Sequence, residues 1–225
     1  MNPVVTENGC VSQIVQEGNR SWPLVLFRDD EHSGPCWTYR GKRITMVRSA
    51  PGELSFTGQI EGLRFSLRYR VHSEHLVLLA SIRNTGTLRL TDVQAGIILG
   101  IDTYMEKHPA WSDRVFPTML RCEKTHFWGY LMGPKGQIMT IATPEPIASY
   151  QIHYKPGQHR IYTVELIPMT PLSLPKRHQN HLHTLEHGEE KIWTITLWPL
   201  TGLNEVKPVA ARLTDAQMVD VEEGD

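Results

Sequence analysis

The sequence has few cysteines and no long apolar run, and each absence excludes a class of protein. Its 225 residues include three cysteines, Cys10, Cys36 and Cys122, whose spacing fits neither a disulfide framework nor a set of metal ligands. A bridge between Cys10 and Cys36 stays open for an oxidising compartment. No apolar stretch approaches the roughly 18 residues of a membrane-spanning segment, and residues 1–19 lack the basic start and apolar stretch of a signal peptide. The sequence therefore predicts neither a disulfide-stapled scaffold nor a transmembrane protein.

An excess of charge of one sign is also lacking. Lys and Arg together number 23 against 24 Asp and Glu, so the overall field favours neither nucleic acid nor an anionic membrane as a partner. A phosphate-cradling glycine loop, a nucleophile elbow and a clear pair of nucleophile and base are absent from the sequence as well. We predict no nucleic-acid partner, no membrane partner and no cofactor.

What the sequence does contain is alternation of apolar and polar residues in short segments. From residue 63 to 71 every second side chain is apolar, beginning with Leu63, Phe65 and Leu67, and the residues between them are three arginines and a serine. This period of two indicates a strand with one buried and one wet face. Asn84-Thr85-Gly86-Thr87 supplies a reversal, because Asn and Gly tolerate positive φ. Strands are predicted at residues 53–57, 63–71, 75–83, 88–101, 115–121, 126–132, 137–142, 148–153, 159–168 and 191–197.

So many strands exceed what one open sheet holds comfortably, because twist accumulates and exposed edges invite aggregation. Two packed sheets solve both problems. We therefore predict an all-β fold, a large two-sheet antiparallel sandwich, as a single domain over residues 1–210. One or two short helices are expected, around residues 104–112 and over 215–221, where Thr214 would cap the helix. Residues 211–225 are predicted to be a short helical or linker-like acidic tail.

One candidate site is the segment 121–130, which combines a carboxylate, an imidazole and two aromatic rings. Trp128 and Tyr130 are suited to lie against the apolar face of a sugar, and Glu123 and His126 to hold hydroxyls or exchange protons. On a strand Glu123 and His126 project to opposite faces, so they need a bulge to act together. An ordinary packed strand with a polar rim explains the same residues.

Two further segments carry candidate ligand groups. His159 and Arg160 precede Tyr162, and this combination suits an acidic or hydroxyl-rich ligand, although a structural ion pair of Arg160 serves equally well. His178 follows a Lys-Arg pair, and His181 and His183 would project from one side of an extended segment, as two metal ligands do. No nearby Cys or Asp completes a metal set, so we predict no metal site here and treat these histidines as locally hydrogen-bonded.

Five short motifs resemble a known family. They are Thr-His-Phe-Trp-Gly-Tyr at 125–130, Gly-Pro-Lys-Gly at 133–136, His-Arg-Ile-Tyr at 159–162, Leu-Pro-Lys-Arg-His at 174–178 and Gly-Glu-Glu-Lys-Ile-Trp at 188–193. They are similar to the N-terminal β-supersandwich module of large bacterial carbohydrate-active enzymes, with a galactose-mutarotase-like fold. Such modules usually precede an (α/α) toroid that carries the catalytic acid and base. The resemblance extends over residues 8–199.

The resemblance implies an accessory or interface module of a bacterial glycoside hydrolase or polysaccharide lyase, not catalytic alone. Its expected partners are a carbohydrate, a downstream catalytic domain, or both, in a periplasmic or secreted location that the sequence itself leaves open. A stop just past the last strand further suggests a domain cut from a longer chain. One alternative is an aldose 1-epimerase-like enzyme acting on a free sugar, with Glu123 or Glu165 as base and His126 or His159 as acid. The other is a stand-alone carbohydrate-binding module.

Overall fold

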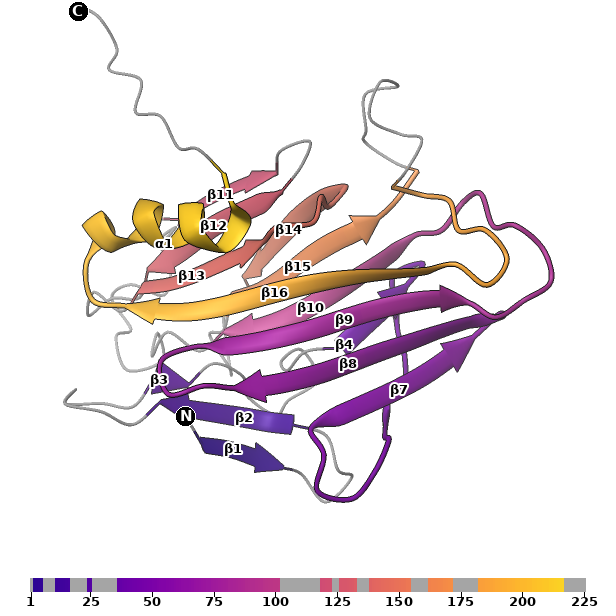
Figure 1. Ribbon diagram of the computed structural model, residues 1–225, viewed down its shortest axis with the longest axis horizontal. Helices are drawn as coiled ribbons and strands as arrows, with labels where there is room; N and C mark the ends of the chain where they lie inside the picture. The colour runs from indigo at the N-terminus through magenta and orange to yellow at the C-terminus, as the bar shows by residue number, and fades with distance from the viewer. Residues whose placement is uncertain are drawn as a thin grey trace, which may run out of the picture.

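Short antiparallel strands dominate the structure of the protein (Figure 1). This computed structural model describes residues 2–5, 11–16, 24–25, 36–101, 118–122, 126–132, 138–154, 162–171 and 182–216. The strands are β1 (Asn2–Val5), β2 (Val11–Gln16), β3 (Leu24–Val25), β4 (Cys36–Tyr39), β5 (Lys42–Arg43), β6 (Val47–Arg48), β7 (Ser55–Ile60), β8 (Leu63–Val71), β9 (Leu76–Asn84), β10 (Ala95–Ile101), β11 (Thr118–Cys122), β12 (Phe127–Met132), β13 (Ile138–Thr143), β14 (Ser149–Tyr154), β15 (Tyr162–Met169) and β16 (Glu190–Leu200). A short 3-10 turn (Leu203–Glu205) leads into one helix, α1 (Val206–Thr214).

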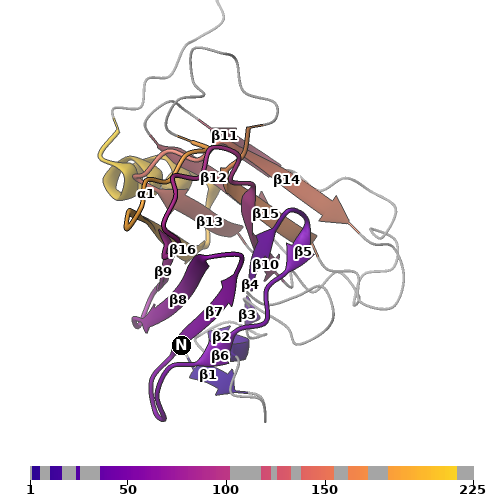
Figure 2. The same ribbon diagram turned by 90° about the vertical axis from the view of Figure 1, so that its right-hand side faces the viewer.

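The strands form three antiparallel sheets, two of which make up the body of the domain. The larger sheet has eight strands in the order β11-β12-β13-β16-β9-β8-β7-β6, and the smaller has five in the order β14-β15-β10-β4-β5. Strands β1, β2 and β3 form a separate three-stranded sheet. In Figure 2, β7, β8 and β9 lie in one layer and β4, β5 and β10 in the other. The predicted all-β, two-sheet antiparallel sandwich is therefore confirmed.

Period-two burial builds the interface between these two layers. Along β8, Leu63, Phe65 and Leu67 are at most 1% exposed, whereas the intervening Arg64 and Arg68 are exposed. The inward side chains of both sheets form one continuous apolar core, from which water is excluded. The main inward positions of the smaller sheet are Trp37, Ala95, Ile97, Leu99, Val164 and Leu166.

Trp37 lies at the centre of this interior. Its ring comes from β4 of the smaller sheet and packs against Phe65 and Trp193 of the larger one, with ring centroids 5.3 Å and 6.1 Å away. Its indole N–H donates a 2.9 Å hydrogen bond to the carbonyl oxygen of Ser66. The same side chain therefore contributes apolar contact and a satisfied polar link between the two layers.

Two hairpins turn within two residues, and their sequences explain how. Between β7 and β8 the turn residues are Glu61 and Gly62, with φ of 49° and 75°. Between β4 and β5 they are Arg40 and Gly41, with φ of 50° and 75°. Two successive positive φ values define the type I′ turn, whose twist matches that of the strands it joins, and glycine takes the second position without strain. These turns fix the register of the pairs and hence which residues face outward.

Helix α1 covers one end of the outer face of the larger sheet (Figure 1), where it contacts β12 and β13. Val206 and Ala210 are buried against Trp128, Ile138 and other side chains of a second, smaller apolar cluster. Thr214 was predicted to cap a helix over residues 215–221, of which residues 217–221 lie outside the described residues, and this role of Thr214 is wrong. Thr214 is the last residue of α1 rather than an N-cap, since its hydroxyl bonds back to the carbonyl of Ala210, and Asp215 adopts the left-handed conformation that ends the helix. The boundary predicted between residues 210 and 211 falls inside α1.

The strand predicted over residues 88–101 was also too long, because only Ala95–Ile101 is paired as a strand. Upstream of it, Leu90 forms an isolated bridge to Leu185, and the buried side chain of Asn84 donates to the carbonyls of Leu88 and Leu185. The segment is thus held by single contacts that apolar periodicity does not reveal. The short helix expected around residues 104–112 lies outside the described residues. None of the described helices is long and apolar enough to cross a membrane.

Candidate functional site

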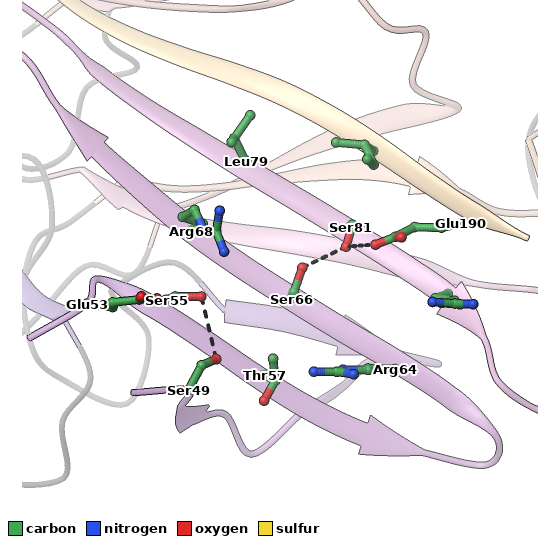
Figure 3. A pocket seen from close by; sticks show the side chains of 12 residues that line it. Ser49, Glu53, Ser55, Thr57, Arg64, Ser66, Arg68, Leu79, Ser81 and Glu190 are labelled. Carbon is green, nitrogen blue, oxygen red and sulfur yellow. Dashed lines mark hydrogen bonds between the residues drawn. The ribbon is translucent and has the colours of Figure 1, made fainter. Parts of the chain in front are cut away.

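A groove of about 410 Å³ crosses the outer face of the larger sheet, on the half that α1 leaves open. Most of its side chains rise from β7, β8, β9 and β16 (Figure 3), while Ser49 and Glu53 lie in the segment between β6 and β7. Alternation explains the direction of those on the strands, because they are the outward neighbours of core residues. The lining residues are Ser49, Glu53, Ser55, Thr57, Arg64, Ser66, Arg68, Leu79, Ser81, Arg83, Glu190 and Ile192.

The strand register places arginines next to one another in this groove. Arg64 of β8 lies directly opposite Arg83 of β9, and Arg83 lies opposite Glu190 of β16. Arg68 stands further along β8, on the same face as Arg64. Within the described part of the chain, the guanidinium groups of Arg64, Arg68 and Arg83 form no ion pair. The three guanidinium groups therefore line the groove without a carboxylate partner among the described residues.

A chain of three hydrogen-bonded side chains forms the middle of the groove floor (Figure 3). The Ser81 hydroxyl donates to Oε1 of Glu190 at 2.7 Å, and the hydroxyl oxygens of Ser66 and Ser81 are 2.6 Å apart. Because a hydroxyl has one hydrogen and that of Ser81 is used on Glu190, the Ser66 hydroxyl donates to Ser81. The Ser66 oxygen then presents only lone pairs to the groove, so it accepts a hydrogen bond from whatever lies above it.

The predicted sugar platform is placed elsewhere. Trp128 is 6% exposed and belongs to the apolar cluster beneath α1, and the half-buried Tyr130 packs against the same cluster. Both rings lie on the outer face of the larger sheet, as the groove does, but the helix covers them. Their size and apolar surface serve to seat α1 on the sheet.

Of the remaining predicted site residues with a histidine side chain, the structure describes His126 and His183. His126 is half-buried immediately before β12, and the Nδ1 atom of His183 bonds to the carbonyl oxygen of Thr91. Among the described residues no three His, Cys, Asp or Glu side chains are grouped as a metal site would require. Glu123, His159, Arg160, His178 and His181 lie outside the described residues.

Glu165, the other carboxylate considered as a base, lies on the outer face of the smaller sheet. Its Oε1 accepts a 2.8 Å hydrogen bond from the hydroxyl of Thr38. Gly96 of β10 lies beneath this contact, and a Cβ atom there would be 2.2 Å from the same carboxylate oxygen. The absence of a side chain at residue 96 therefore lets the carboxylate of Glu165 cross the strand to Thr38, on the opposite side of the domain from the groove.

On the same face of the larger sheet as the groove, a column of stacked side chains joins the β8–β9 hairpin to α1. The ring centroids of Trp198 and His75 are 4.4 Å apart, and those of His75 and His72 are 4.3 Å apart. Arg212 of α1 lies on the Trp198 ring, 4.5 Å from its centroid. Burial lowers the pKa of His75, the neighbouring His72 and Arg212 lower it further, and Glu74 acts in the opposite direction. The stack therefore favours neutral His75.

We expect acidification to weaken this stack. Because the pKa of His75 in the folded state lies below its ordinary value of 6.5, the unfolded chain takes up the proton first, and stability falls as the pH drops below about 6.5. The His75→Phe variant keeps a flat ring without a titrating group. Its melting temperature, measured by circular dichroism between about pH 7.5 and 5, should fall less steeply than that of the unmodified protein. Equal slopes in the two proteins would contradict this account.

Comparisons with known proteins support the fold. No protein-family model matches the chain, and no curated protein matches it in sequence. A solved polysaccharide lyase is similar in structure, with a TM-score of 0.59 over 94% of this chain at 11% identity. A putative aldose 1-epimerase from Escherichia coli K12 has a TM-score of 0.49 and 12% identity over 88% of this chain and 80% of its own.

At these identities the likeness shows the fold alone. It confirms the predicted galactose-mutarotase-like β-supersandwich, a fold with carbohydrate-related structural neighbours. The chain spans about a third of the polysaccharide lyase, since the match covers 34% of that protein. The similarity to the epimerase is too distant to support an argument about activity.

Proposed function

We propose that this chain is a carbohydrate-binding β-sandwich module of a polysaccharide-processing protein, binding a glycan in the groove of the larger sheet without turning it over. The observation that carries the proposal is the groove itself, a hollow on an otherwise regular sheet lined by hydroxyl, guanidinium and carboxylate groups. Such groups make the dense hydrogen bonds that sugar hydroxyls require. The likeness to one third of a polysaccharide lyase is consistent with a module that works beside another domain.

The chemical groups of the groove favour binding over catalysis. An epimerase-like reaction needs a carboxylate base and an imidazole acid near one sugar carbon, and the lining residues include two glutamates but no histidine. Glu190 is held by Ser81, and Glu53 lies at the other end of the groove (Figure 3). This separation supports a role in recognition for both carboxylates.

The Ser66→Ala variant tests the binding site. If the Ser66 oxygen accepts a hydrogen bond from the glycan, its loss should cost about 1 kcal/mol, or about a fivefold rise in Kd. Affinity is measured by titration calorimetry with oligosaccharides identified on a glycan array. Ser73→Ala, at the exposed β8–β9 turn outside the groove lining, is the matched control and should leave the Kd unchanged.

Turnover is measured on the same glycans. We expect no release of reducing ends, no absorbance from unsaturated products and no acceleration of anomerisation by polarimetry. If Ser66→Ala binds the glycan with an unchanged Kd, the groove is not the binding site. Any steady turnover by the isolated chain would replace the binding role by an enzymatic one.

A further inference from the structure

We propose that the ligand of the groove is an acidic oligosaccharide whose uronate carboxylates are bound by Arg64, Arg68 and Arg83; this inference rests on the proposed carbohydrate-binding function. It adds the chemical class of the sugar, which the fold and the comparisons leave open. Three observations carry it: the concentration of positive charge, the unfavourable way in which that charge is arranged, and the spacing of the arginines along the groove.

The first observation is that the groove lining has an excess of basic over acidic residues, whereas the chain as a whole does not. The protein carries a formal net charge of −1, yet three arginines and no lysine line the groove, against two glutamates. A guanidinium presents paired N–H donors that match the two oxygens of a carboxylate, whereas a neutral sugar hydroxyl uses only one of them.

The second observation is that the arrangement opposes the stability of the free protein. Arg64 and Arg68 share one face of β8, and Arg64 has Arg83 directly opposite it on β9. Like charges in directly opposed cross-strand positions are destabilising. Glu190 lies opposite Arg83 on its other side, but it accepts from Ser81, and among the described residues neither Arg64 nor Arg83 forms an ion pair with a carboxylate. An anionic ligand bound above the two strands relieves the repulsion between Arg64 and Arg83. Binding of such a ligand therefore explains why two arginines face each other.

The third observation concerns length. Arg64 and Arg68 are four residues apart on one strand, which corresponds to about 13 Å at about 3.3 Å per residue. This distance exceeds one sugar ring, so a ligand that engages both arginines spans more than one sugar. Between them the Ser66 oxygen accepts a hydrogen bond, since its own hydrogen is donated to Ser81. The groove thus matches an oligosaccharide in which two carboxylates flank a free hydroxyl group.

The test compares acidic oligosaccharides with matched neutral ones. The probes are short oligogalacturonates, oligomannuronates and oligoglucuronates, each beside the same oligosaccharide with its carboxylates reduced to primary alcohols. We expect at least one uronate to bind about tenfold or more tightly than its reduced partner, with an affinity that falls as salt is added. A sulfated neutral oligosaccharide forms a further arm, and tighter binding there would overturn the assignment to carboxylates.

Three variants locate the effect. Arg64→Gln and Arg83→Gln should each weaken uronate binding about tenfold or more while changing the affinity for the reduced oligosaccharide less than about twofold. Arg70→Gln removes a cation from the same strand and face, outside the groove lining, and should change neither affinity. Melting temperatures report on folding, and we expect those of Arg64→Gln and Arg83→Gln to equal or exceed that of the unmodified protein.

The outcomes separate this inference from the function on which it rests. Equal affinity for the acidic and reduced oligosaccharides overturns the acidic ligand and leaves carbohydrate binding in place. A preference for uronates that survives both groove substitutions, or that Arg70→Gln also abolishes, overturns the assignment to this groove. Binding of no member of the panel, acidic or reduced, overturns the proposed function and the inference together.

Discussion

Replacing Trp37 by alanine is expected to lower the free energy of unfolding by about 3–5 kcal/mol, as truncation of a fully buried aromatic residue generally does. Trp37 is 0% exposed and touches Phe65 and Trp193 across the sandwich. Its removal leaves a void between the two sheets and breaks the bond from the indole N–H to the Ser66 carbonyl. Urea denaturation followed by tryptophan fluorescence and circular dichroism measures the loss.

The Trp37→Phe variant separates packing from the hydrogen bond. It retains an aromatic ring but leaves the Ser66 carbonyl without its donor, so a smaller loss of about 1–3 kcal/mol is expected. Because Ser66 belongs to the groove, this variant should also alter glycan affinity, while an equally destabilised variant elsewhere should not. A loss below about 1 kcal/mol for Trp37→Ala would contradict the central place that we assign to this ring.

Gly58→Val is the second change with a large expected effect, at about 3 kcal/mol. Gly58 lies in β7 beneath the segment that leads into β6, and a Cβ there would be 2.6 Å from the backbone oxygen of Thr45 and 2.7 Å from Cγ2 of Ile44. Backbone atoms cannot move aside as the end of a flexible side chain does, so the segment must shift away from the sheet. A fall in the urea midpoint without a change in the slope would report this loss.

Thr57→Val is the matched control for this prediction. Residue 57 is the neighbour of Gly58 on β7, but its side chain faces the groove rather than the segment above. We expect a change within about 0.5 kcal/mol. Similar losses for Gly58→Val and Thr57→Val would indicate that β7 tolerates no bulk on either face, and the close approach at Gly58 would not be the cause.

The fold could be predicted from the sequence because burial with a period of two is a local property. The segment 63–71 was placed with the bounds that β8 has, and its alternate side chains are buried as predicted. Helix α1 was not predicted, because its apolar face is short and its neighbours are side chains from distant strands. Thr214 has the residue type of an N-cap, but the structure places it at the last position of α1.

The candidate site could not be predicted in the same way, because it depends on register. The alternation identified the polar face of β8, with Arg64, Ser66 and Arg68 on it. Nothing local indicates that Arg83 lies opposite Arg64, or that Glu190, 109 residues after Ser81, bonds to it. Composition directed attention instead to Trp128 and Tyr130, whose rings the structure places beneath α1. Exposure, rather than residue type, distinguishes the groove from these aromatic side chains.

The interleaving of core and groove residues along β8 has a consequence for engineering. Phe65 and Leu67 hold the sandwich together, while Ser66 between them faces the ligand space. A substitution at an outward position exchanges one recognition group and leaves the packed layer untouched, since the neighbouring side chains point the other way. The outward residues of the sheet can therefore be substituted one at a time without changing the core. The proposed specificity for a glycan is then set by residues that can be redesigned separately from the fold.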